Sequence, residues 1–178
     1  MGSTLVWVFR FLHIVSAVAW VGGAIIWTMV IAPRLLRDGP PAIRRPVIEA
    51  LIGAVPRYFH AVGGATIGFG ILLLGQLVGW ANFSATLQGI YLGTSYGYAI
   101  GLGLILAVAM FLEGFLIIEP TIKKLLATMQ AQPPGPPSAQ AQAALAALGK
   151  KMAIAGISSV TMGVIALGAM TWAVNQVR

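Results

Sequence analysis

Two histidines, each preceded three residues earlier by an arginine, are the residues in this chain whose types and spacing could do chemistry. They occur in the tetrads "RFLH" (Arg10 to His13) and "RYFH" (Arg57 to His60), and the sequence has no other histidine. Imidazole is a common ligand of haem iron and of transition metals. An arginine one helical turn away can pair with a carboxylate of the same cofactor. Both tetrads are therefore candidate cofactor sites.

The tetrads lie in strongly apolar sequence. The chain has 178 residues, of which 58% are hydrophobic and 8% are charged, whereas about a quarter of the residues of soluble domains are charged. Four stretches are long enough to cross a bilayer, which takes about 20 residues in a helix. We therefore predict a single all-α membrane domain over residues 1–178, folded as an antiparallel four-helix bundle with spans at about 5–32, 57–80, 96–118 and 152–177.

The charge distribution predicts the orientation of these spans. The connections at residues 33–56 and 119–151 contain eight of the 11 lysines and arginines, and the connection at 81–95 contains none. By the positive-inside rule the two basic connections are cytoplasmic, so both termini lie outside a bacterial-type cell membrane. Anionic membrane lipids are the expected partners of the basic residues. Nucleic acid is not expected, because this charge lies beside membrane spans.

The two basic connections also carry structural signals of their own. In "PAIRRPVIEALIGAVP" apolar residues recur with a helical period, which predicts a short amphipathic helix in the cytoplasmic interface between the first two spans. In the later connection, "PPGPP" separates a helical extension after Pro120 from an alanine-rich run that leads into the last span. Cysteine is absent, which excludes disulfides and thiolate metal sites.

The two histidines are predicted to lie in opposite leaflets. With a rise of about 1.5 Å per helical residue, His13 lies about 12 Å and His60 about 30 Å from the outer face. The two axial nitrogens of one haem iron lie within about 4 Å of each other, because metal–nitrogen bonds are near 2 Å. The histidines therefore do not bind one metal together. Either each histidine belongs to a cofactor site of its own, or both serve helix packing alone.

Each histidine has a different set of candidate partners. Met170 of the last span lies at the depth of His13, and histidine with methionine is an ordinary pair of haem ligands. Glu113 of the third span lies near the depth of His60, where it could pair with the imidazole or relay protons. Arg10 and Arg57 would pair with haem propionates. Two haems in opposite leaflets would carry electrons across the membrane.

Small residues and one tryptophan accompany the histidines. Gly63, Gly64 and Gly68 lie on the face of His60, where they leave room for a flat cofactor or simply allow the helices to pack closely. Trp20 lies on the same helical stripe as His13. We interpret Trp20 as an aromatic packing anchor.

Copper is the competing cofactor. Seven methionines and two histidines suit Cu(I), which takes thioether and imidazole ligands. No M-x-x-M or M-x-M cluster occurs, and scattered methionines are usually packing residues. Haem b is therefore the first expectation and copper the second, with His13 and His60 as the ligands of either.

The first predicted span resembles the first helix of the copper-resistance D (CopD)-like membrane proteins. The stretch "LHIVSAVAWVGGAIIWTMVIAPRLL" shares with that group Leu12–His13, Trp20, Gly22, Gly23, Pro33 and Arg34. The second span, "PRYFHAVGGATIGFGILLLG", shares its arginine-aromatic start and glycine-rich body. The opening is also similar to that of the HemJ-type protoporphyrinogen oxidases, in which a helix-one histidine is implicated in haem handling. This chain departs from the HemJ pattern because its third span has no lysine.

The resemblance implies a four-helix bundle linked to copper or haem, with His13 as the residue carried over most directly. The leading hypothesis is a CopD-like protein that binds haem b or a metal through His13 and His60. No enzymatic activity is expected. The alternative is a cofactor-free accessory subunit of a larger membrane respiratory or transport complex. The chain could also assemble with copies of itself as a homo-oligomer. A copper permease ranks third.

Overall fold

The computed structural model describes residues 2–35, 41–51, 53–85, 93–132 and 138–175. Every regular element within these residues is a helix. Four helical stretches are long and apolar enough to cross a membrane, which confirms the predicted all-helical chain with four long apolar segments. Residues 86–92 of the predicted outer connection and the whole of "PPGPP" lie outside the described residues.

The first half of the chain forms two long helices joined through a short one. α1 (Gly2–Ile26) continues into a π-helical segment, η1 (Trp27–Ile31). The predicted amphipathic helix is α2 (Pro41–Leu51). It precedes α3 (Ala54–Val78), which begins three residues before the predicted span. Two short turns, η3 (Trp80–Asn82) and α4 (Phe83–Ala85), follow α3.

The second half forms two helices that are longer than a membrane span. α5 (Ser95–Glu113) passes through a second π-helical segment, η5 (Gly114–Ile118), into α6 (Glu119–Gln130). α7 (Ala139–Asn175) has 37 residues and joins the alanine-rich run to the last span. At about 1.5 Å per residue α7 is roughly 55 Å long, against roughly 30 Å for a hydrocarbon core. We call the end of the molecule that holds α2, α6 and the first turns of α7 the basic end.

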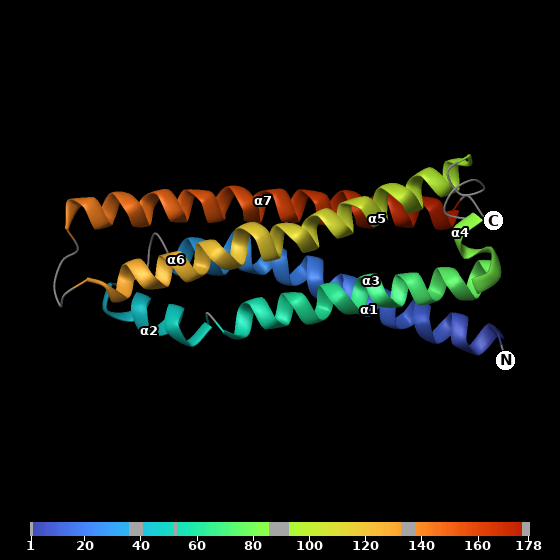
Figure 1. Cartoon of the computed structure of the whole chain (residues 1–178), viewed down its shortest axis with the longest axis horizontal. Coiled ribbons are helices and arrows are strands. Elements are labelled where there is room, and N and C mark those ends of the chain that lie inside the picture. The colour runs from blue at the N-terminus through green and yellow to red at the C-terminus, as the bar shows by residue number, and fades with distance from the viewer. Residues whose placement is uncertain (1, 36–40, 52, 86–92, 133–137, 176–178) are drawn as a thin grey trace.

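The long helices pack most closely in two pairs, α1 with α3 and α5 with α7 (Figure 1). Along the first pair, His13 packs beside Gly70 and Trp20 beside Gly63. Residue numbers therefore rise along α1 as they fall along α3. In Figure 1 both ends of the chain lie at the same end of the molecule, opposite the basic end.

The best-packed contact in the first pair surrounds Trp20, which is 4% exposed. Its indole meets the ring of Phe111 edge-on, with centroids 6.2 Å apart and an interplanar angle of 86°. A Cβ atom on Gly63 would lie 2.9 Å from Phe111 and 3.0 Å from Trp20. Trp20 is thus a packing residue, as interpreted from the sequence.

The same contact corrects one expectation about the glycines. Gly63 leaves no room for a cofactor, because the rings of Trp20 and Phe111 fill the space beside it. Gly64 and Gly68 have no heavy atom within 4 Å of an added Cβ. A helix with apolar residues on every face gives no sequence signal for which glycine meets a neighbour.

We expect Gly63→Val to lower the free energy of unfolding by about 2 kcal/mol, because the added methyl groups overpack the contact with Trp20 and Phe111. Gly64→Val is the matched control, since it adds the same atoms in open space. Unfolding in detergent, followed by tryptophan fluorescence, measures both. Equal effects of the two substitutions would contradict this account of the contact.

Candidate ligand-binding cavity

A cavity with a volume of about 940 Å³ lies between α1–η1, α3, η5–α6 and α7. Such a volume falls in the range of small-molecule and cofactor sites, roughly 300–1,000 Å³. The wall is mainly aromatic and aliphatic, including Trp20, Trp27, Phe59, Met110, Ile118, Ile122 and Met152. The cavity is therefore suited to a ligand with a large apolar body.

Both π-helical segments contribute to this wall. Trp27, Thr28 and Met29 of η1 and Gly114 and Ile118 of η5 border the cavity. A π-helical turn accommodates an extra residue and is found often at functional sites. Both segments lie at the same cavity, which marks this part of the molecule as a candidate site.

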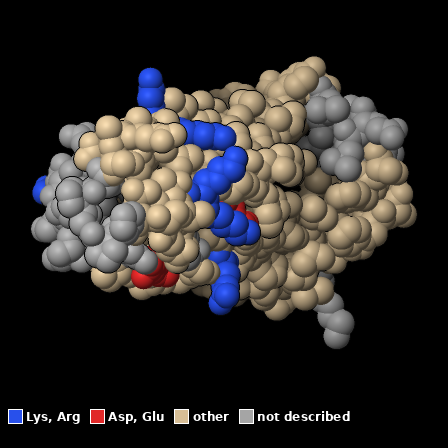
Figure 2. All heavy atoms as spheres, turned by 60° about the vertical axis from the view of Figure 1, so that its left-hand side comes forward, with Lys and Arg blue, Asp and Glu red and all other residues tan. Residues whose placement is uncertain are grey.

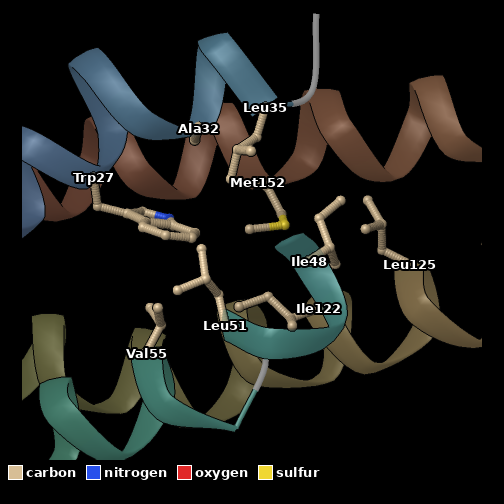
Figure 3. Close-up of a pocket in the computed structure, with 9 residues that line it drawn as sticks. All are labelled: Trp27, Ala32, Leu35, Ile48, Leu51, Val55, Ile122, Leu125 and Met152. Carbon is tan, nitrogen blue, oxygen red and sulfur yellow. The ribbon is translucent and has the colours of Figure 1, made fainter. Parts of the chain in front are cut away.

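The helix α2 lies at the basic end, where a small apolar pocket of about 30 Å³ adjoins the cavity. Figure 3 shows Ile48 and Leu51 of α2 on one side of this pocket, with Trp27 and Met152 across it. Ile48 is 8% exposed. The apolar face that the sequence analysis assigned to the membrane interface thus packs, at least through these residues, against the protein.

His60 is the one histidine on the cavity wall. Its ring stacks on Phe115 with centroids 3.7 Å apart and an interplanar angle of 3°, and it meets Phe111 edge-on. Its Nε2 lies 3.7 Å from Glu119 Oε2, which is beyond ordinary hydrogen-bond distance. Aromatic contacts therefore hold the plane of the ring, while neither ring nitrogen makes a hydrogen bond to another described residue.

The carboxylate beside His60 is Glu119, a residue that the sequence analysis did not select. Glu119 Oε1 lies 2.6 Å from Lys123 Nζ, one helical turn along α6. The sequence signal for this ion pair is the E-x-x-x-K spacing of Glu119 and Lys123, which favours an ion pair on a helix. The ion pair balances most of the charge of Glu119, so little negative charge remains at this side of the cavity.

Glu113, which the sequence analysis offered as a partner of His60, has a different partner. The hydroxyl of Ser159 on α7 donates a hydrogen bond of 2.6 Å to Glu113 Oε2. Ser159 is 5% exposed and lies on the cavity wall. This bond ties α5 to α7 in the pair that lies opposite α1 and α3.

His13 lies apart from His60. Its Nδ1 is 2.8 Å from the carbonyl oxygen of Thr66, and its ring rests beside Gly70. Gly70 follows His60 by ten residues along α3, or about 15 Å. This separation agrees with the prediction that the two histidines do not share a metal. A histidine that donates Nδ1–H to a carbonyl presents Nε2 to a ligand, but His13 borders neither of the two cavities described.

The remaining predicted site residues also lie away from the cavity wall. Met170 packs on Gly103 of α5, where an added Cβ would come within 2.7 Å of its terminal methyl. Arg10 and Arg57 are exposed, and neither has an ion pair or hydrogen bond to a described residue. Within the described part of the chain, no group of three or more histidine, aspartate or glutamate side chains could hold a metal ion.

Comparison of the chain with protein-family models, with curated proteins and with solved structures gave no match. The architecture and the cavity therefore define the class of protein: an all-helical chain with four long apolar helices around a mainly apolar cavity that carries one histidine.

We expect Ser159→Ala to lower the free energy of unfolding by about 1 kcal/mol, because Glu113 loses its hydrogen-bond donor. Ser158→Ala, one residue away on α7, is the control. In the Glu113→Ala background Ser159→Ala should cost less, because the acceptor of the hydrogen bond is already gone. A double-mutant cycle of unfolding in detergent measures this coupling, and strict additivity would argue against the bond.

Proposed function

We propose that this chain is a four-span membrane protein, folded as an antiparallel bundle, that binds one haem b at His60. Four apolar helices of spanning length support the membrane assignment. So do the large apolar side chains on their outer faces, such as Ile105 (66% exposed) and Leu116 (71% exposed), since extended apolar surface in water is unfavourable. The register of α1 against α3 supports the antiparallel arrangement.

The distribution of basic residues supports a cytoplasmic location of the basic end, with both termini outside a bacterial-type membrane. The chain lacks cysteine, so single cysteines can report its orientation. We expect Ala81→Cys to react with a membrane-impermeant maleimide in intact cells and Ala143→Cys to react only after lysis. Both positions are exposed. The reverse labelling pattern would overturn the orientation.

One observation carries the haem assignment: His60, with neither ring nitrogen hydrogen-bonded to a described residue, borders a cavity of about 940 Å³. Phe115 and Phe111 hold its ring, and Glu119 lies 3.7 Å from Nε2, beyond ordinary hydrogen-bond distance. The apolar wall would surround the porphyrin and exclude water from it.

Three methionines on the same wall, Met110, Met129 and Met152, border the cavity, whereas Met170 does not. If haem binds there, one of these thioethers would be better placed than Met170 to join His60 as a ligand. When bound, haem b would supply one-electron redox chemistry. A bare copper ion fits the cavity less well, because its ligands must converge within about 2–2.3 Å of one point.

The structure gives His13 less support as a haem ligand than His60. Its ring fits against Gly70 and Thr66, and it borders neither of the two cavities described. We therefore propose one haem rather than two. The resemblance to the CopD-like proteins is in keeping with a haem or copper protein.

The purified protein should show a Soret band and α-bands that sharpen on reduction with dithionite. We expect His60→Ala to remove at least about nine-tenths of the bound haem, because iron loses its imidazole ligand. His13→Ala is the matched control and should retain it.

Loss of haem in His13→Ala with retention in His60→Ala would overturn the assignment to His60. A featureless spectrum from protein made with ample haem would overturn haem binding altogether. In that case stoichiometric co-purification of another membrane protein would favour the accessory-subunit hypothesis.

A further inference from the structure

We infer that Lys150 binds an anionic group of the cavity ligand, so that the ligand is an amphipathic anion with its charged group at the basic end. The inference rests on the proposed function, in which the anionic groups are the propionates of haem. It assigns the propionate partner to α7 rather than to Arg10 or Arg57.

The charge balance of the wall is the first argument. His60, Glu119 and Lys150 are the titratable residues that border the cavity among the described residues. Glu119 is paired with Lys123 at 2.6 Å. Lys150 has no ion pair or hydrogen bond to a described residue. Lys150 is therefore the charged residue of the wall that has no partner among the described residues.

The position of Lys150 along α7 is the second argument. Lys150 precedes Asn175, at the far end of α7, by 25 residues. This number of residues spans about 38 Å of helix, which is longer than the roughly 30 Å of a hydrocarbon core. Gln142 of the same helix also borders the cavity. The polar groups that α7 contributes are thus Gln142 and Lys150 toward the basic end and Ser159 further in.

Figure 2 shows lysine and arginine side chains in a band across the molecule, in a view that brings the basic end forward. Lys150 and Lys151 are both exposed, and Lys150 differs from Lys151 in that it also borders the cavity. An ammonium group at the polar end of an apolar cavity suits a carboxylate on a large apolar body.

A phospholipid phosphate is the other anion that a lysine at this depth attracts. Such an ion pair would lie on the outer surface of the protein, and Lys150 and Lys151 would then contribute equally to anion binding. The two adjacent lysines therefore provide a matched pair for the test, with the same change in charge at neighbouring positions of one helix.

The test compares iron-free protoporphyrin IX with its dimethyl ester. In the ester both carboxylates are esterified and therefore neutral. Without iron, binding does not depend on ligation by His60. Trp20 and Trp27 border the cavity, so quenching of tryptophan fluorescence in the full-length protein, in nanodiscs of zwitterionic lipid, reports porphyrin binding.

We expect Lys150→Ala to weaken protoporphyrin IX binding about tenfold, because a charge-assisted hydrogen bond is lost. Binding of the dimethyl ester should change less than about twofold, and Lys151→Ala should change either ligand by no more than that. Lys150→Arg should restore most of the affinity, because it retains the charge.

Equal effects of Lys150→Ala and Lys151→Ala would overturn the inference, even if haem binds at His60. Protoporphyrin binding that requires Lys150, in a protein without a His60-dependent haem spectrum, would support the inference and overturn the proposed iron ligation. Absence of porphyrin binding by the wild-type protein would overturn both.

Discussion

The contact between Trp20 and Gly63 is the interaction on which the rest of the arrangement depends. Glycine lets the indole of α1 approach the backbone of α3, and Phe111 of α5 closes the contact from the side. Phe111 in turn meets the ring of His60. One close-packed aromatic cluster thus joins three helices, borders the cavity and supports its histidine. Small residues at helix interfaces let the helices approach closely, so that dispersion contacts accumulate.

The cavity exists because the two helix pairs approach each other closely at some levels and less closely at others. α7 comes near α1 where Gly163 faces Val21 and where Gly156 faces Thr28. Between these helices and α3, α5 and α6, the π-helical segments border a space that is lined but not filled. The volume and the mainly apolar wall of this cavity are typical of ligand sites, and for this reason we connect the cavity with ligand binding.

The polar groups of the cavity differ in how far the protein itself satisfies them. Ser159 and Glu113 bond to each other, and Glu119 pairs with Lys123. His60 and Lys150 have no hydrogen bond or ion pair within ordinary hydrogen-bond distance to a described residue. One is a metal ligand by type and the other an anion ligand by type. A ligand that offers both an electron-pair acceptor and an anionic group on an apolar body would engage the two together.

The sequence by itself determined the number and place of the long apolar helices and the separation of the two histidines along the bundle axis. Both follow from local quantities, the length of an apolar run and the rise per residue. It also determined that α2 is helical, from the period of its apolar residues. Only the tertiary structure decided that Glu119 rather than Glu113 lies beside His60. It also decided that the space beside Gly63 is filled while the space beside Gly64 is open, and that Lys150 borders the cavity. The physical reason is rotation about the helix axis: a helix that is apolar on every face carries no period that marks its inner side, so its rotation is fixed only by the side chains of the helices packed against it.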